Sequence, residues 1–267
     1  MSDKDFHGQV AIVTGAGEGI GYAIAEQLVA NGARVVLNDV DPTKADHAAR
    51  TISETYIGGE CVGVGGNVGE VYVVRGLVAE AVERFGRVDI AVANAGITLW
   101  NNFLDYTPED FQRVLAVNLG GSFFLAQAAA KQFKSQGTGG RILFMSSVTG
   151  HQGIEYLSAY GMTKAALEML ARQLTVELAP HGITINAVAP GATVTPRNLA
   201  DDPDYEAHWS GVTPTGKPAY PADIAHAALF LLSPASGQIS GQTIVVDGGW
   251  TGVSPTPSLD FVDDGEG

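Results

Sequence analysis

Tyr160 and Lys164 stand four residues apart at the start of a segment with helical character. Residues with this spacing share one helical face, so the phenol and the ammonium can reach the same site. A free tyrosine has a pKa near ~10 and is a poor base at neutral pH. A cation at ~4 Å in an effective dielectric of ~20 stabilises tyrosinate by about 4 kcal/mol, which predicts a pKa suited to general acid–base catalysis. The same spacing is common in ordinary helices, so the remaining sequence must decide.

Length and composition indicate one globular domain. The chain has 267 residues, of which 45% are hydrophobic and 16% are charged, enough apolar material for one large core. Its net charge is −14, which argues against nucleic acid and anionic membranes as partners. Residues 1–250 are predicted to form the domain, and residues 251–267 read as an acidic C-terminal tail.

The numbers and spacing of cysteine and histidine residues indicate which disulfides, metal sites and cellular compartment to expect. Cys61 is the single cysteine, so no intramolecular disulfide forms, and a reducing cytosol is expected. The six histidines lack metal-ligand spacing. The start of the sequence carries no apolar signal region, and no run approaches the ~20 apolar residues of a membrane span. We therefore expect a cytoplasmic protein without a metal centre.

A glycine-rich turn joins the first predicted strand to the first predicted helix. The apolar run 9–14 reads as a strand covered on both faces. A helix follows over residues 22–31. In this context glycines let the backbone approach a pyrophosphate that rests on the positive end of the helix. The turn consists of Gly15, Ala16, Gly17, Glu18, Gly19, Ile20 and Gly21.

The second strand, residues 34–39, ends at Asp39, 18 residues past Gly21. This is close to the ~20 expected for an acid that binds the adenosine ribose. Asp39 could instead cap the next helix, but Asp41 or Thr43 serves that purpose better. The chain continues with a helix at 44–56, a strand at 60–65, a loop starting at Asn67 and a helix at 71–85.

The second half alternates strands and helices in the same way. A strand from residue 89 runs into Asn94-Ala95-Gly96, and a helix from Pro108 to about Gln136 is predicted to break near Asn118. Ser147 follows the strand 141–146, where ligands of such sheets bind. The Tyr160 helix runs to about residue 179, and strand 184–189 leads into Pro190-Gly191. A helix at 222–232 and a strand at 243–247 complete a single-domain Rossmann-type, doubly wound parallel sheet of about seven strands.

Residues 195–216 form a polar stretch between the strand at 184–189 and the helix at 222–232. A loop of this length inside a compact domain is usually functional. We expect it to act as a lid over the substrate.

The combined motifs resemble the short-chain dehydrogenase/reductase family over residues 6–250, and most closely its glucose-dehydrogenase-like and secondary-alcohol-dehydrogenase-like members. The residues that carry the resemblance occur in family order: Thr14-Gly15-x-x-x-Gly19-x-Gly21, Asn94-Ala95-Gly96, Asn118, Ser147, Tyr160-x-x-x-Lys164, Pro190-Gly191 and Val245-Val246-Asp247-Gly248-Gly249. Ser147 is preferred over Ser146 because it lies 13 residues before Tyr160.

The resemblance implies a catalytic set of four residues. Tyr160 would be the acid/base, and Ser147 would hydrogen-bond the substrate oxygen. Lys164 would lower the Tyr160 pKa and hold the nicotinamide ribose. Asn118 would position a water that links Lys164 to solvent. Hydride would pass between a substrate carbon and the nicotinamide.

The resemblance also implies an extended cofactor site. Thr193 departs from the branched aliphatic residue usual near the carboxamide, and Asn67 replaces an aspartate that meets the adenine amine. Ala93 replaces an asparagine, which affects strand packing. The expected cofactor contacts are Gly15, Gly17, Glu18, Gly19, Ile20, Gly21, Asp39, Val40, Asn67, Val68, Asn94, Ala95, Gly96, Tyr160, Lys164, Pro190, Gly191, Thr193 and Thr195.

NAD is the predicted cofactor. Asp39 would accept hydrogen bonds from both adenosine ribose hydroxyls and would repel a 2′-phosphate. Glu18 and Asp41 are acidic too, and the first cation after Asp39 is Lys44. A basic residue that would neutralise the phosphate is therefore missing from the expected positions.

The substrate is expected to be a small alcohol or carbonyl compound. Residues 98–100, 149–157 and the 195–216 lid would line its side of the pocket. His151, Gln152 and Glu155 either bind a sugar or polyol or are solvated loop residues. A ketoacyl reductase acting on carrier-protein or CoA thioesters is the alternative, disfavoured because acyl carrier proteins are acidic like this chain. A non-catalytic dinucleotide sensor is a further alternative, disfavoured because the catalytic set is complete. The resemblance implies a homotetramer, with a dimer as the second choice.

Overall fold

The structure, a computed structural model, describes residues 6–254 of the chain. Residues 251–254 follow the last strand and include part of the helical turn Trp250–Gly252. The rest of the predicted acidic tail, residues 255–267, lies outside the described residues.

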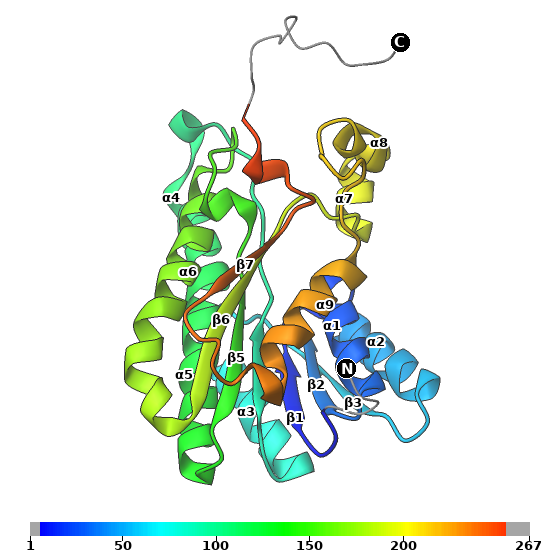
Figure 1. Ribbon diagram of the computed structural model, residues 1–267, viewed down its shortest axis with the longest axis vertical. Coiled ribbons are helices and arrows are strands. Elements are labelled where there is room, and N and C mark those ends of the chain that lie inside the picture. The colour runs from blue at the N-terminus through cyan, green and yellow to red at the C-terminus, as the bar shows by residue number, and fades with distance from the viewer. Residues whose placement is uncertain (1–5, 255–267) are drawn as a thin grey trace, which may run out of the picture.

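Seven strands form one sheet in the order β3-β2-β1-β4-β5-β6-β7 (Figure 1). Every pairing between neighbouring strands is parallel. Central strands are fully buried because helices cover both faces, which explains the unbroken apolar sequences of β1 and β4 and the mostly apolar sequence of β6. The strands are β1 (Val10–Val13), β2 (Arg34–Asp39), β3 (Glu60–Gly65), β4 (Ile90–Ala93), β5 (Gly140–Met145), β6 (Ile183–Pro190) and β7 (Thr243–Val246).

Two helical layers enclose the sheet, as Figure 1 shows. Helices α1 (Gly19–Ala30), α2 (Pro42–Thr55) and α9 (Pro221–Leu232) bury Ile24, Ile52 and Leu229 against one face. Helices α3 (Val71–Phe85), α5 (Ser122–Gln136) and α6 (Ser158–Leu178) bury Leu77 and Phe133 against the other. The doubly wound parallel sheet expected from the sequence is confirmed.

The long helix predicted from residue 108 is divided by one π-helical segment. Helix α4 (Pro108–Val114) begins at Thr107, whose hydroxyl accepts from the Asp110 amide at 3.1 Å. Residues Leu115–Gly121 are π-helical, and α5 continues from Ser122. The whole stretch is long and apolar enough to cross a membrane by length and composition, yet α5 packs its apolar face on the sheet. A π segment inside an α-helix is rare and common at functional sites.

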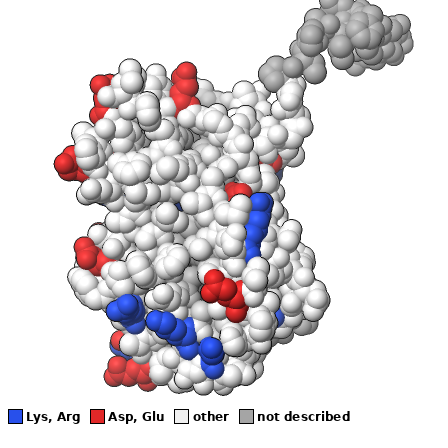
Figure 2. All heavy atoms as spheres, turned by 90° about the vertical axis from the view of Figure 1, so that its left-hand side faces the viewer, with Lys and Arg blue, Asp and Glu red and all other residues white. Residues whose placement is uncertain are grey.

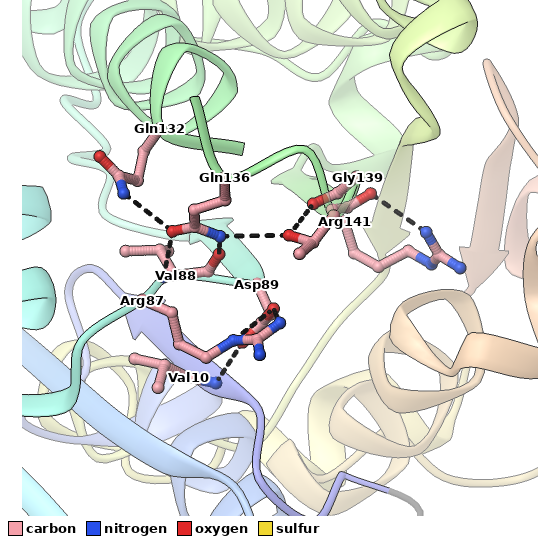
Figure 3. A network of polar contacts seen from close by, with 10 residues as sticks. Val10, Arg87, Val88, Asp89, Gln132, Gln136, Gly139 and Arg141 are labelled. Atoms are coloured by element: carbon pink, nitrogen blue, oxygen red, sulfur yellow. Dashed lines mark hydrogen bonds and ion pairs between the residues drawn. The ribbon is translucent and has the colours of Figure 1, made fainter. Parts of the chain in front are cut away.

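A polar network anchors the amino-terminal end of β4 (Figure 3). The Asp89 carboxylate accepts from the Val10 amide at 2.9 Å and pairs with the Arg87 guanidinium. The Gln136 side chain accepts from the Val88 amide at 2.9 Å and donates to the Val88 carbonyl at 2.7 Å. These hydrogen bonds hold the end of α5 and the start of β1 to β4, at the end of the sheet opposite the glycine turn.

The lid is helical, which corrects the expectation of a loop over residues 195–216. Helices α7 (Pro196–Asp201) and α8 (Tyr205–Ser210) occupy most of it (Figure 1). The Thr195 hydroxyl accepts from the Asn198 amide at 3.2 Å and caps α7. The Asn198 side chain donates to the Thr193 carbonyl at 2.9 Å. These local hydrogen bonds stabilise helix α7, which the weak apolar pattern of the segment did not predict.

Candidate active site

A cavity of about 500 Å³ opens beyond the carboxyl ends of the strands. This is within the size range of small-molecule and cofactor sites. The structure gathers most of the expected residues around it: Gly15, Glu18, Gly19, Ile20, Gly21, Asp39, Val40, Asn67, Val68, Asn94, Ala95, Gly96, Ser147, Tyr160, Lys164, Pro190, Gly191, Thr193 and Thr195. Gly17 and Asn118 do not line it.

The glycine turn is fixed against the end of β4. The Asn94 side chain donates to the carbonyls of Thr14 and Gly15 at 2.9 and 2.8 Å, and the Thr14 hydroxyl accepts from the Asn94 amide. A Cβ on Gly21 would lie 2.4 Å from the Gly15 carbonyl oxygen, so only glycine fits there. Gly15 has a φ of 60°, a conformation that favours glycine. The turn is thus built by close backbone packing and leaves the cavity side open.

Asp39 lies at the end of β2 beside the glycine turn. Its carboxylate accepts from the Gly17 amide at 3.1 Å and from the Asp41 amide at 3.1 Å. Asp41 caps α2 by accepting from the Thr43 amide at 2.8 Å, as expected from the sequence. The Gly17 amide therefore orients the Asp39 carboxylate, and Gly17 itself does not line the cavity.

Lys44 comes closer to Asp39 than its place in the sequence suggests. Its ammonium forms an ion pair with Glu18 at 2.8 Å. Hydrogen bonding to Glu18 is the main cause that raises the pKa of Lys44, and the charges of Asp39 and Asp41 add to it. This cation is therefore already surrounded by acidic side chains.

The Tyr160 hydroxyl reaches the cavity from the first turn of α6. Burial raises the pKa of Tyr160 above its ordinary value, while hydrogen bonds with Ser147 and Thr98 and the charge of Arg197 act in the opposite direction. The sequence predicted a pKa lowered by Lys164, and this is wrong for the protein without ligands. Desolvation of the phenolate outweighs its polar neighbours.

Lys164 is buried, and its ammonium is directed to the backbone. Its Nζ donates to the Met145 carbonyl at 2.7 Å and lies 5.3 Å from the centre of the Tyr160 ring. Desolvation lowers the pKa of Lys164 to about 8. The amine can therefore change its charge near neutral pH.

Asn118 lies behind the cavity wall, inside the π-helical segment. Its Oδ1 accepts from the Ile97 amide at 2.8 Å, and its Nδ2 donates to the Ile97 carbonyl at 3.0 Å and to Thr163 Oγ1 at 3.2 Å. A Cβ on Gly96 would lie 3.4 Å from the Lys164 ammonium and 3.5 Å from Asn118 Oδ1. The buried Asn118 side chain thus connects α6, the π-helical segment and the loop that follows β4, beside Lys164.

The two serines after β5 have different surroundings. Both serines border the cavity. The Ser146 hydroxyl lies within hydrogen-bond distance of the Glu168 carboxylate at 2.6 Å and of the Lys164 carbonyl at 3.0 Å. Glu168 is buried and also contacts His151 Nε2 at 3.2 Å. Ser146 therefore takes part in internal bonds, whereas Ser147 acts on the pKa of Tyr160.

Part of the expected substrate side lies elsewhere. His151 and Gln152 line a second hollow of about 330 Å³ between the 149–157 loop and α6, and Glu155 lines neither space. Trp100 is exposed and outside the main cavity, whereas Thr98 lines it. The prediction that residues 149–157 border the same cavity as Tyr160 is corrected accordingly: most of them line the second hollow.

Arg113 on α4 and Val117 in the π-helical segment line the cavity and were not predicted from the sequence. Their i, i+4 spacing offered a signal. Arg197 and Asn198 also line the cavity, and both lie within the 195–216 stretch that was expected to border the substrate. Their place on helix α7 was not predicted, because a local cap rather than an apolar face defines that helix.

The arrangement suits a bound dinucleotide and an alcohol or carbonyl substrate. A Cβ at Gly19 would meet only Thr195 across the cavity, at 3.7 Å, so the glycine turn and the start of the lid face each other. Asp39 supplies acceptors at one end. Hydroxyls of Ser147, Thr98 and Tyr160 gather at the other end. Such groups can hold a substrate oxygen and exchange its proton.

Known proteins share this sequence and fold. A family model described as enoyl-(acyl carrier protein) reductase matches residues 15–251. An L-rhamnose-1-dehydrogenase of Scheffersomyces stipitis is 36% identical over 247 residues, spanning 91% of this chain and 96% of that protein. An L-rhamnose 1-dehydrogenase (NAD(P)(+)) of Azotobacter vinelandii is 37% identical over 245 residues, spanning 90% and 96%.

Two solved structures are similar along nearly the whole chain. A short-chain type dehydrogenase/reductase from Mycobacterium marinum superposes with a TM-score of 0.87 at 35% identity, covering 93% of this chain and 98% of that one. A 7α-hydroxysteroid dehydrogenase in complex with NADH and 7-oxo glycochenodeoxycholic acid gives a TM-score of 0.87 at 34% identity, covering 93% and 97%.

Proposed function

The chain belongs to the short-chain dehydrogenase/reductase family, and we propose that it is an NAD(H)-dependent oxidoreductase. Its substrate is a secondary alcohol or the matching ketone of a sugar, polyol or other small hydroxy compound. The observation that carries this proposal is the meeting of Tyr160, Ser147 and Lys164 at one end of a cavity whose other end holds Asp39. The L-rhamnose dehydrogenases among its relatives support a sugar-like substrate.

Tyr160 is the proton-transfer group in this proposal. Bound nicotinamide supplies hydride chemistry: the carbinol carbon loses a hydride and its hydroxyl loses a proton, which leaves a carbonyl. Tyr160 accepts that proton during oxidation and returns it during reduction. Ser147 donates to the same substrate oxygen as negative charge develops on it. Because burial raises the pKa of Tyr160, its hydrogen-bonding hydroxyls are needed to make proton transfer effective at neutral pH.

Lys164 and Asn118 support the acid/base residue. Lys164 has a pKa of about 8, so it is mostly charged at neutral pH. Its ammonium would hold the nicotinamide ribose hydroxyls. Asn118 is assigned a positioning role, because its amide bonds Ile97 and Thr163. Its expected part in holding a water stays a prediction.

NAD rather than NADP is the proposed cofactor. Asp39 would accept hydrogen bonds from the adenosine ribose hydroxyls, and Glu18 lies at the same end of the cavity. Lys44, the nearest cation, already pairs with Glu18 at 2.8 Å. A 2′-phosphate would therefore meet uncompensated negative charge in a partly buried site.

The remaining assignments follow from the same proposal. The lid, residues 195–216, closes over the substrate once the cofactor is bound. The protein acts in the cytoplasm, which fits its single cysteine. It assembles as a homotetramer, or as a dimer if the second interface is weak.

Reduced-nicotinamide absorbance tests the proposal directly. Purified protein is assayed with NAD and a panel of sugars, polyols, sugar acids and simple secondary alcohols, and in reverse with NADH and ketones. Ketoacyl thioesters of CoA and of a carrier protein belong in the same panel. We expect turnover of at least one small hydroxy compound. Turnover of thioesters alone would identify a ketoacyl reductase, and NADH binding without turnover of any member would indicate a dinucleotide sensor.

A further inference from the structure

Arg197 crosses the substrate end of the cavity from the lid. Its Nη2 donates to the Thr98 carbonyl at 2.9 Å. Thr98, Tyr160 and Arg197 all line the cavity. Thr98 and the charge of Arg197 are both among the causes that act to lower the pKa of Tyr160. The guanidinium and the catalytic phenol therefore lie close to Thr98, on the substrate side of the cavity.

The charge around Arg197 is unbalanced. Among residues 6–254, the ion pairs within 4.0 Å all involve other side chains, so no carboxylate neutralises this guanidinium. The acids that line the cavity are Glu18 and Asp39, both at its adenosine end. The guanidinium has five N–H donors, and one of them is bonded to Thr98. The remaining donors can form a bidentate pair with a carboxylate. In a chain of net charge −14, such a cation at a cavity mouth favours an anionic ligand.

Two other uses of Arg197 are weaker explanations. A latch that holds α7 to Thr98 needs a hydrogen-bond donor but no charge, and any polar side chain of similar length would serve. A contact with the cofactor pyrophosphate would direct the guanidinium to the glycine turn. Thr195 faces that turn at Gly19, whereas Arg197 is directed to Thr98. Its position beside Tyr160 fits the substrate better.

We propose that Arg197 binds a carboxylate of the substrate, so that the protein acts on hydroxy carboxylates, sugar acids included. The carboxylate lies one or two carbons from the reacting hydroxyl, because Arg197 and Tyr160 line the same part of the cavity beside Thr98. This inference rests on the proposed dehydrogenase function of the same cavity.

Binding of matched acid and amide probes tests the inference without turnover. Acetoacetate and acetoacetamide, and pyruvate and pyruvamide, are titrated calorimetrically into protein saturated with NAD⁺, which cannot oxidise a ketone. In at least one pair, we expect the acid to bind about ten- to a hundred-fold more tightly than its amide, as for charge-assisted hydrogen bonds. Equal affinity within both pairs, or no binding of either acid, would overturn the inference.

Variants test whether the Arg197 guanidinium causes the preference for the acid over its amide. Arg197→Gln keeps length and a hydrogen-bond donor for Thr98 but removes the charge, so it should bind acid and amide about equally. Arg197→Lys keeps the charge without the fork and should restore part of the preference. Arg50→Gln removes a charge from the exposed face of α2 and should leave the preference unchanged. Loss of the preference in Arg50→Gln as well would mean that net charge, not Arg197, attracts the acid.

Two further readouts separate this inference from the proposed function. The NADH dissociation constant of Arg197→Gln should stay within about three-fold of wild type. A large loss of NADH affinity would instead assign Arg197 to the cofactor and overturn the substrate role. If the wild type oxidises neutral alcohols as well as acids, the dehydrogenase function stands and the carboxylate inference fails. Absence of NADH binding would contradict the proposed function itself.

Discussion

At the scale of single residues, burial governs the protonation of the catalytic pair. Desolvation raises the pKa of Tyr160 and lowers that of Lys164 to about 8. Both shifts favour the neutral forms of the side chains. Spacing in the sequence predicted that the two groups share a face, but it carried no information on their desolvation. The groups that act to lower the pKa of Tyr160 are Ser147, Thr98 and the charge of Arg197, and burial outweighs them.

The stability of Lys164→Met should differ from that of wild type in a pH-dependent way. The folded pKa of Lys164 lies near 8, below its ordinary value of 10.5, so the unfolded chain binds more protons between these values and wild-type stability rises with pH. Relative to the variant, the wild-type free energy of unfolding should rise by about 2 kcal/mol from about pH 7.5 to about pH 10. Urea unfolding of both proteins without cofactor measures this difference. A constant difference would show that Lys164 is not desolvated.

Asp39 should control cofactor choice. Losing hydrogen bonds worth roughly 1.5–3 kcal/mol while adding repulsion predicts that NADP is disfavoured by about two orders of magnitude. The measurement is kcat/KM for both cofactors with one substrate. Asp39→Ala should narrow the gap mainly by weakening NAD, because Lys44 remains paired with Glu18. Equal wild-type values, or a preference for NADP, would refute the role of Asp39.

At the scale of elements, regular segments were predictable and irregular ones were not. Apolar runs, Gly15 and Gly21 indicated the strand–turn–helix unit, because parallel strands and close turns leave strong local signals. The break near Asn118 was predicted, but its π-helical form was not, since it depends on bonds to Ile97 and Thr163 from distant segments. The 195–216 stretch that contains Arg197 was expected to border the substrate, but its helices were not predicted, because a local cap rather than an apolar face defines α7.

Asn118→Ala should destabilise the protein through the π-helical segment. The change leaves the buried Ile97 amide and carbonyl without their partners. Each unsatisfied group costs about 1–3 kcal/mol, so the free energy of unfolding should fall by about 2–4 kcal/mol. Asn102→Ala is the matched control, because it removes an exposed amide that accepts only from Leu104 and should cost about 1 kcal/mol or less. Chemical denaturation that finds equal losses would contradict the bridging role of Asn118.

At the scale of the whole molecule, the outer face of α4–α6 is the strongest candidate for an interface. Figure 2 shows this face, with several small groups of charged side chains and a broad uncharged area in its upper and central part. Phe111, Phe123, Met169 and Val176 are exposed large hydrophobic residues on these helices. A patch of this kind marks an interaction site more often than a solvated surface.

Assembly is therefore expected to bury this face. We predict a homotetramer of dihedral symmetry, in which α4–α6 form one interface and α9 with β7 form another. Val176→Glu, at a side chain 78% exposed in the monomer, should shift the mass toward smaller species because it would bury a charge. Glu177→Gln, an exposed neighbour on α6, is the control and should not. A monomer mass for the wild type by light scattering at micromolar concentration would contradict the prediction.

Turnover by Tyr160→Phe tests the central claim, that this cavity is a dehydrogenase site with Tyr160 as its acid/base. The substitution removes only the hydroxyl that hydrogen-bonds Ser147 and Thr98. With the best substrate from the panel, we predict that kcat falls by a factor of about 10²–10⁴, as for loss of a general acid–base group. NADH binding, followed by fluorescence in the same samples, should stay nearly unchanged. A variant that keeps a substantial fraction of wild-type kcat would contradict the account.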